Sequence, residues 1–292
     1  MHILKSLLFI LVFSIAKPAY AEAEISTFGS VEEINASLFK SLDDRDASRV
    51  LIIMPLENFI LKPIDPELNI KDDRFLSITS KLDSQIKLSK KDYLTELKLT
   101  EYKQELSDPK IIDFFHNIQK RNAPFLVVTR NFSGSFNNIP YLEAWTWGSL
   151  FERGLDLSKS PLGSKQIIFN EKNHKINGTY PTLYRGLLSC NFKDGFNSSQ
   201  SLIAKLLAIN LKWIPDVVYI IDPNEGYIRS MDGQLKIIKN DIQIKGFVYA
   251  PEEAMLDQVS PERFLKFWQG MIKKLNAVTR KELKSKENPY EQ

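Results

Sequence analysis

The sequence predicts an α/β protein with a central parallel sheet flanked by helices. Apolar runs at 49–54, 125–129 and 217–221 have the continuous hydrophobic character of strands that are buried on both faces. A helical pattern precedes the second run and begins at Asp108, with Pro109 in its first turn. Strands that alternate with helices are typical of a parallel sheet with helical crossovers.

The first 21 residues predict a Sec-type signal peptide that is cleaved after Ala21. Lys5 lies in a short basic start, 6–16 is an apolar run, and Ala19-Tyr20-Ala21 supplies small residues two apart. The alternative is an uncleaved anchor, but the apolar run is too short to span a bilayer. We therefore expect a periplasmic or secreted protein that has no transmembrane anchor after cleavage.

The composition argues against several classes of function. Loss of Lys5 and Lys17 with the signal peptide lowers the net charge from +3 to +1, which gives no electrostatic basis for nucleic-acid binding. Cys190 is the only cysteine and is expected to pack as a small buried hydrophobe, with an intermolecular disulfide as the alternative. His116 and His174 have no zinc-ligand spacing, so zinc is disfavoured, and no cofactor is expected apart from a weakly held magnesium ion.

The mature chain is long enough for one large domain with an insert. We expect that domain at 22–280, followed by a polar tail at 281–292. A lead-in helix is expected within 22–48, with Ser30 as its N-cap. Residues 62–107 are polar with apolar positions at heptad-like spacing, which predicts a small helical cap insert beside the first strand end.

The second half of the sequence predicts the remaining elements. These are a helix at 139–158 that contains Trp145 and Trp147, a hairpin-like pair at 167–169 and 184–189 around an Asn177-Gly178 turn, helices at 198–210, 226–240 and 261–275, and a strand at 242–249. The aromatic side chains of the first of these helices are expected in the core, with a ligand or partner surface as the alternative.

Polar loops follow three predicted strands, at 55–58, 129–131 and 222–224. The carboxyl ends of parallel strands form the ligand site of open α/β sheets, so these loops should converge. The ordered set resembles the haloacid-dehalogenase-like (HAD-like) superfamily, in particular a family of exported bacterial proteins of unknown function. The resemblance covers about 45–275 and implies a Rossmann-like HAD core with a small helical cap.

The resemblance implies specific catalytic groups. An aspartate at the first strand end attacks phosphorus, and a second acid two residues later transfers protons. This chain has Pro55 at the first position and Glu57 at the second. Thr129 matches the phosphoryl-binding hydroxyl, while the expected lysine falls near Gln200. The family's nucleophile is therefore missing.

The resemblance also implies a magnesium ion held by acidic residues. Asp222 is retained, Pro223 replaces the next acid, and Glu225 is a distant substitute. Together with Glu57, these side chains would hold magnesium only weakly. Lys193 and Lys205 flank the expected lysine position but are not in register with it.

Three hypotheses follow. The first is an exported HAD-like protein that has lost aspartyl-phosphate phosphatase chemistry and binds an unknown protein or a small phosphorylated ligand. The second is a divergent magnesium-dependent phosphohydrolase in which Glu57 is the general base, with Thr129, Arg130 and Asp222 orienting the substrate. The third is an unrelated α/β protein whose motifs align by chance.

Overall fold

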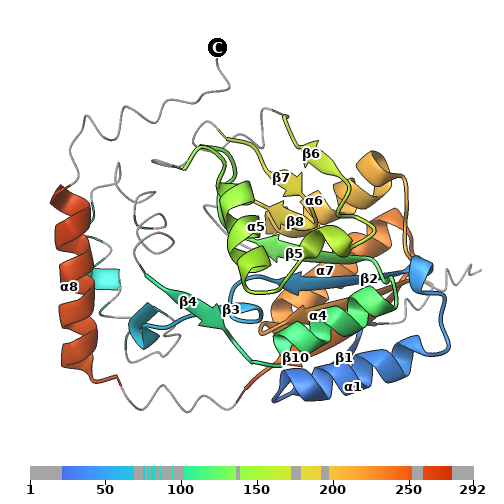
Figure 1. Ribbon diagram of the computed structural model, residues 1–292, viewed down its shortest axis with the longest axis horizontal. Coiled ribbons are helices and arrows are strands. Elements are labelled where there is room, and N and C mark those ends of the chain that lie inside the picture. Colours follow the sequence, from blue (N-terminus) through green and yellow to red (C-terminus); the bar gives the residue numbers. More distant parts are fainter. Residues whose placement is uncertain are drawn as a thin grey trace, which may run out of the picture.

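The fold is built on one sheet of eight strands, which among the described residues lie in the order β1-β10-β9-β2-β5-β8-β7-β6 (Figure 1). The computed structural model describes residues 22–68, 102–135, 139–171, 179–191, 197–251 and 259–277, with scattered positions between 75 and 94. The strands are β1 (Glu24–Phe28), β2 (Val50–Pro55), β5 (Phe125–Thr129), β6 (Gln166–Ile168), β7 (Thr182–Tyr184), β8 (Leu187–Ser189), β9 (Val217–Asp222) and β10 (Gln243–Tyr249).

The part of the sheet from β1 to β8 is parallel, which confirms the predicted fold class. Its strand order changes direction between β2 and β9. From β2 the chain moves outward through β5 to β8, and it then returns to β9 on the other side of β2. In open α/β sheets, ligands bind outside the carboxyl ends of the strands at such a switch point.

Helices cover both faces of this sheet. One face is covered by α1 (Val31–Leu42), α4 (Ile111–Lys120) and α5 (Leu142–Glu152), and the other by α6 (Asn197–Lys205) and α7 (Glu225–Ile238). A π-helical segment, Leu206–Leu211, continues α6, and short 3-10 turns lie at Ala47–Arg49, Pro66–Leu68 and Leu157–Lys159. None of the helices in the described part of the chain has the length and apolar character needed to cross a membrane.

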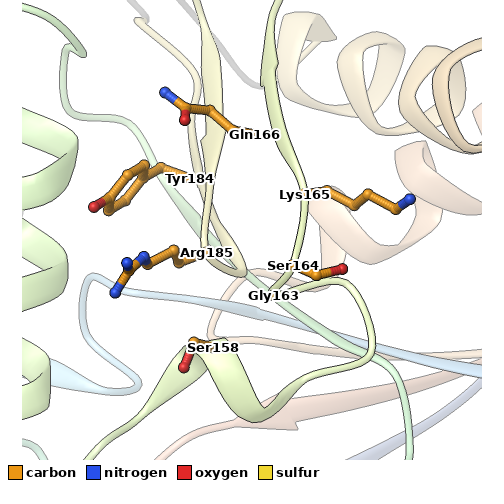
Figure 2. Close-up of a pocket in the computed structure, with 7 residues that line it drawn as sticks. All are labelled: Ser158, Gly163, Ser164, Lys165, Gln166, Tyr184 and Arg185. Carbon is orange, nitrogen blue, oxygen red and sulfur yellow. The ribbon is translucent and has the colours of Figure 1, made fainter.

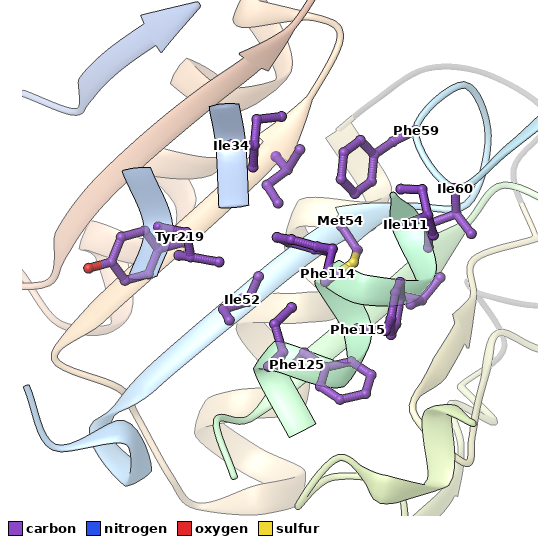
Figure 3. Close-up of a cluster of buried hydrophobic side chains, with 14 of the residues drawn as sticks. Ile34, Ile52, Met54, Phe59, Ile60, Ile111, Phe114, Phe115, Phe125 and Tyr219 are labelled. Carbon is purple, nitrogen blue, oxygen red and sulfur yellow. The ribbon is translucent and has the colours of Figure 1, made fainter. Parts of the chain in front are cut away.

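Alternate residues of the central strands face the two helical layers. On the side of α1 and α4, Ile52 and Met54 of β2 pack with Phe114 and Phe115 of α4 (Figure 3). The ring of Phe115 meets that of Phe125 edge to face at 5.4 Å. Because both sides of β2 are covered, its sequence is continuously apolar rather than alternating.

The two edges of the sheet depart from the predicted elements. We expected one helix within 22–48, but residues 24–28 form edge strand β1. The predicted N-cap is confirmed, because α1 begins directly after Ser30, whose Oγ accepts a hydrogen bond from Glu33 N. We also expected 184–189 to form a single strand. Instead, Arg185 and Gly186 adopt φ values of 48° and 85° and form a tight turn between β7 and β8. The predicted turn at Asn177-Gly178 lies outside the described residues.

The start of α4 was also predicted too early. Asp108 is not its N-cap, because the helix begins at Ile111 and no side chain caps it. The Asp108 carboxylate instead accepts hydrogen bonds from Lys110 N at 2.8 Å and from Val31 N at 3.3 Å. Asp108 therefore joins the start of α4 to the start of α1.

The insert predicted to be helical at 62–107 is helical at described positions 75, 78, 80–82 and 94, but it begins and ends as strands. An antiparallel ribbon joins β3 (Leu61–Pro63) to β4 (Gln104–Leu106), and most residues between these strands lie outside the described part. Three buried apolar residues of the insert, Phe75, Leu82 and Ile86, pack with α8 (Pro261–Ala277) in a cluster separate from the sheet core. Figure 1 shows α8 standing apart from the sheet, beyond β3 and β4.

Candidate functional site

The end of β2 turns sharply at the carboxyl edge of the sheet. Leu56 N donates to Val128 O at 2.8 Å, so the pairing with β5 continues one residue past Pro55. Asn58 has a φ of 64°, in the left-handed region, and its N–H donates to Leu61 O at 2.8 Å. This turn leaves Glu57 at the boundary between β2 and β5.

The Glu57 carboxylate is tied to the end of β5. Its Oε1 accepts a short hydrogen bond from the Thr129 hydroxyl and a second from Arg130 N at 3.3 Å. Thr129 Oγ1 also accepts from Asn131 N at 3.1 Å. The structure thus brings together two of the predicted site residues, Glu57 and Thr129, with the single proton of the hydroxyl directed to the carboxylate.

Burial is the main influence on the ionisation of Glu57. Desolvation raises the pKa of its carboxyl group, while the hydrogen bond from Thr129 and the charge of Arg130 act in the opposite direction. The side chain is only partly exposed, between two packed strand ends. A raised pKa makes a carboxyl group a better proton acceptor than an ordinary glutamate.

Asp222, at the end of β9, shapes the loop that leads into α7. Its Oδ1 accepts from Asn224 N at 2.7 Å, and Asn224 in turn caps α7 by accepting from Tyr227 N. Burial raises the pKa of the Tyr227 phenol, and the charge of Asp222 adds to that rise while Arg130 opposes it. Charged groups at the ends of β5 and β9 therefore act on the ionisation of the same phenol.

Cys190 follows β8 on the same edge and is buried, as the sequence predicted. Burial raises the pKa of its thiol well above the usual range, and the negative charge of Glu57 contributes to the rise. The thiol is therefore a neutral, inert core group at neutral pH. Glu57 and Arg130 therefore also act on a group at the end of β8.

Glu225 is engaged away from the other predicted ligands. It lies in the first turn of α7, where its Oε1 accepts from Arg229 Nη2 at 2.7 Å in an exposed pair. No three histidine, cysteine or acidic side chains in the described ranges gather closely enough to hold a metal ion. Glu57, Asp222 and Glu225 therefore do not form the three-carboxylate magnesium site that the resemblance implied.

The lysine expected near Gln200 has no equivalent among the described residues at this edge. Lys205 forms an ion pair with Glu171, and Lys193 lies outside the described residues. Gln200 itself is fully buried in α6. In the sequence this polar residue stands three and seven positions before the buried apolar residues Ile203 and Leu207, so all three lie on one face of the helix. That spacing is the sequence signal of its burial.

A buried polar network supports the loop that follows β5, and the sequence interpretation missed it. The Oδ1 atom of Asn191 accepts from Ser133 N at 2.7 Å, and its Nδ2 donates to Thr179 Oγ1 at 2.9 Å. Glu143 accepts from Gly134 N at 2.6 Å. The sequence signal for this arrangement is an asparagine two residues past the end of β8, and in the structure it takes a φ of 58°.

A polar pocket of about 530 Å³ lies at the opposite end of the sheet, beside the Arg185-Gly186 turn (Figure 2). Its lining residues include Lys165 and Arg185, but Figure 2 shows their side chains pointing to opposite sides. Arg185 stacks over the ring of Trp147 at 4.8 Å. The two cations do not converge on a common point, so we place the candidate site at the carboxyl edge instead.

The aromatic side chains of α5 are divided between packing and solvent. Trp147 stacks on Phe151, with ring centroids 5.1 Å apart and an interplanar angle of 18°. Trp145 is 42% exposed and Phe151 is 52% exposed, so part of this helix remains an open aromatic surface. The prediction that these aromatics are core residues is therefore correct for part of the set only.

The chain is similar to uncharacterized proteins of several Rickettsia species. It is 32% identical to one from Rickettsia typhi over 205 residues, which is 68% of each chain. It is 28% identical to one from Rickettsia felis over 299 residues, with 98% of each chain covered. The match to a Rickettsia conorii protein is 30% identical over 252 residues, 84% of this chain and 82% of the relative. No solved structure matches the chain.

A family model covers most of the chain. It matches residues 27–279, from β1 through the end of α8, and therefore includes the sheet, the insert and the C-terminal helix. The chain belongs to the family described as protein of unknown function DUF2608.

Proposed function

We propose that this chain is an exported HAD-like binding protein that does not perform aspartyl-phosphate chemistry. Its ligand or protein partner would be recognised at the carboxyl edge of the sheet, where the ends of β2, β5 and β9 come together. Export rests on the predicted signal peptide at 1–21. The proposed fold assignment and the proposed loss of catalysis rest on separate observations.

The strand order supports a HAD-like, Rossmann-like core. Numbered along the chain, β2, β5, β8, β9 and β10 are strands one to five, and they lie in the order 5-4-1-2-3. Read in the opposite direction, this is the 3-2-1-4-5 order of the doubly wound nucleotide-binding fold. The β3/β4 ribbon leaves the core directly after β2, so the insert it carries begins beside the proposed site.

The hydrogen bond from Thr129 to Glu57 is the observation that carries the functional proposal. A phosphoryl group would need this hydroxyl as a donor, and the hydroxyl has only one proton to give. In this structure the proton is directed to Glu57, and the Arg130 amide is directed there as well. The groups expected to hold a phosphoryl oxygen instead hold a carboxylate of the protein.

The residue at the nucleophile position supports the same conclusion. Pro55 offers no nucleophilic atom and no backbone N–H. Each tenfold loss in rate corresponds to about 1.4 kcal/mol of barrier, and loss of a covalent nucleophile costs several such factors. The described residues of this site also lack the expected lysine. The aspartyl-phosphate pathway therefore has two defects, a missing nucleophile and a missing cation.

A divergent hydrolase is the second candidate, and the raised pKa of Glu57 favours it. A carboxylate with that property could accept a proton from water, provided that the Thr129 hydroxyl turned away from it. Magnesium is often bound by one or two carboxylates together with the phosphate of the substrate. Glu57 and Asp222 would be the first carboxylates to test for that role.

A phosphatase assay separates the two candidates. The mature chain is incubated with a broad panel of phosphomonoesters and magnesium, beside the variants Glu57→Gln and Asp222→Asn. The binding-protein proposal predicts no turnover above a protein-free blank for the wild type, and the same result for the surface variant Arg229→Ala. If the wild type turns over a phosphomonoester and either site variant abolishes that turnover, the proposal is refuted and the chain is a hydrolase.

A further inference from the structure

The outer edge of strand β6 is unpaired in the described part of the chain. β6 is the last strand on one side of the sheet and pairs there only with β7 (Figure 1). In this antiparallel ladder, Phe169 N donates to Pro181 O at 2.9 Å. Positions that bond to the neighbouring strand alternate with positions that do not. Ile167 and Phe169 therefore direct their backbone groups to β7, while Gln166 and Ile168 direct theirs outward.

This edge is also open to solvent. The outward backbone groups of Gln166 and Ile168 form no hydrogen bond with a described residue. Gln166 is exposed, and Ile168 is 49% exposed. Unpaired strand edges are templates for a further strand, and several classes of protein bind extended peptides in this way. The edge of β6 thus has the geometry of a strand-binding site that a partner can reach.

The charge at the start of β6 selects among possible partners. Lys165 is exposed and forms no ion pair with a described residue. The pocket shown in Figure 2 lies beside this end of the strand, and its lining adds Arg185 but no acidic side chain. The nearest acids along the chain, Asp156 and Glu171, already accept hydrogen bonds from other side chains. Lys165 is therefore available to an acid from another molecule.

We propose that the outer edge of β6 binds an extended, acidic segment of a partner protein as an added antiparallel strand. This site lies apart from the carboxyl edge of the sheet and does not depend on the function proposed there. The partner's acid lies opposite Lys165, because oppositely charged side chains on neighbouring strands stabilise the pairing. Lysine on an edge strand also hinders indiscriminate pairing, which makes the edge selective for a strand that brings an acid.

The face of the sheet beside this edge specifies a second position of the partner. Gln166 lies opposite Tyr184, whose ring meets that of Trp147 in α5 edge to face at 6.4 Å. Alternate side chains of a strand share a face, so Ile168 also lies on the side of α5. An apolar partner residue opposite Ile168 would cover its exposed side chain. Read from its N-terminus, the added strand is therefore apolar opposite Ile168 and acidic three residues later, opposite Lys165.

A second copy of this chain fits the edge less well than an acidic partner. Residues 163–171, which contain β6 and its flanks, hold a single acid, Glu171. That carboxylate is already paired with Lys205. Antiparallel pairing of two copies would therefore bring a lysine to the interface from each chain and no free acid to meet it.

A short peptide that matches this description is the probe. Acetyl-Thr-Val-Thr-Thr-Glu-Thr-amide places its valine opposite Ile168 and its glutamate opposite Lys165, and the matched peptide has lysine in place of glutamate. The mature chain is titrated with each, and backbone amides are followed by ¹H–¹⁵N NMR and hydrogen exchange. We expect the glutamate peptide to bind about threefold to fivefold more tightly. It should slow exchange at Gln166 and Ile168, which in the free chain exchange faster than Ile167 and Phe169.

Two N-methylated forms of the glutamate peptide test the main-chain bonds separately from the charge. Methylation of the valine nitrogen removes the N–H that would donate to the carbonyl oxygen of Ile168, and it should weaken binding about tenfold. Methylation of the next nitrogen, opposite Ile167, removes an N–H that points away from β6. That change should have little effect on binding.

Two variants of the protein test the same edge. Ile168→Pro removes the outward N–H and keeps the ladder between β6 and β7, because that N–H takes no part in the ladder. It should abolish peptide binding. Lys165→Glu changes an exposed side chain, and it should reverse the preference so that the lysine peptide binds more tightly. The surface variant Arg229→Ala, on α7, should leave binding of both peptides unchanged.

Four results would overturn the proposal. They are unchanged exchange at Gln166 and Ile168 with either peptide, equal effects of the two methylations, an unchanged preference in Lys165→Glu, and dimerisation of the free chain that Ile168→Pro abolishes. The last result would show that a second copy fills the edge. None of them bears on the carboxyl edge of the sheet, whose proposed function fails on phosphomonoester turnover instead.

Discussion

The hydroxyl of Thr129 donates its proton to the carboxylate of Glu57, and this bond joins the carboxyl ends of the neighbouring strands β5 and β2. The same oxygen accepts from Asn131 N, so the hydroxyl is engaged as both donor and acceptor within the protein. The site expected to hold a ligand's phosphoryl group is therefore closed by the protein's own side chains.

A double-mutant cycle on Glu57 and Thr129 should show strong coupling. Thr129→Val leaves a partly buried carboxylate without its hydroxyl donor, which should lower the free energy of unfolding by about 1.5–3 kcal/mol. In the Glu57→Gln background the same change should cost clearly less. Urea unfolding of the four proteins measures the coupling. Thr146→Val is the control, because its buried hydroxyl has no partner in the described part of the chain and its loss should not destabilise. Additive effects would show that the bond contributes little.

The stability of the wild type relative to Glu57→Gln should depend on pH. Burial raises the pKa of Glu57 in the folded chain above the ordinary value of about 4.3. Between the two pKa values the folded state holds a proton that the unfolded state has lost. The contribution of Glu57 therefore becomes less favourable as pH rises through that window and is constant above it. Unfolding measured at a series of pH values should show that the free energy of unfolding of the wild type rises relative to that of the variant as pH falls. A difference that stays flat, or that grows with rising pH, would mean that the pKa is not raised.

Restoring an aspartate at the nucleophile position should not restore catalysis. In Pro55→Asp the Thr129 hydroxyl still bonds to Glu57, and Gln200 still adds no positive charge near a phosphoryl group. We expect no hydrolysis of p-nitrophenyl phosphate with magnesium, in common with the control Pro55→Ala. Turnover by the aspartate variant alone would show that the remaining groups form a competent site and that position 55 is the only defect.

The C-terminal helix should depend on Glu67 for its position against the insert. Glu67 is 3% exposed, its carboxylate pairs with Arg263, and its carbonyl oxygen accepts from Trp268 Nε1 at 3.2 Å. Arg263→Ala leaves that carboxylate buried without its cation, so we expect a loss of about 1–3 kcal/mol in unfolding free energy. Arg229→Ala breaks an exposed pair and should cost less than about 0.5 kcal/mol. Equal losses in the two variants, measured by urea unfolding, would contradict this role for Glu67.

The sequence predicts the centre of the fold better than its edges. β2, β5 and β9 are buried on both faces, so their apolar runs are visible without any knowledge of contacts. β1 is a partly exposed edge strand with the mixed sequence Glu24–Phe28, which has no such pattern. The ribbon at the ends of the insert depends on pairing between residues about 40 positions apart in the sequence, and periodicity does not reveal such pairing.

The candidate site is predicted in outline only. Parallel topology is enough to bring the loops after β2, β5 and β9 to one edge, and Glu57 and Thr129 do meet there. Which partner each side chain takes depends on local backbone geometry. The left-handed Asn58 ends the turn that leaves Glu57 beside β5, while Glu225 pairs with Arg229 one turn along its own helix. Residue order alone does not reveal these choices.

A crystal structure of the mature chain soaked with magnesium and orthovanadate, a phosphate mimic, tests the central claim most directly. We expect the bond between Thr129 and Glu57 to remain intact, with neither vanadate nor metal between the ends of β2, β5 and β9. Vanadate bound to the Thr129 hydroxyl, with magnesium on Glu57 and Asp222, would contradict the claim that this edge has lost phosphoryl chemistry.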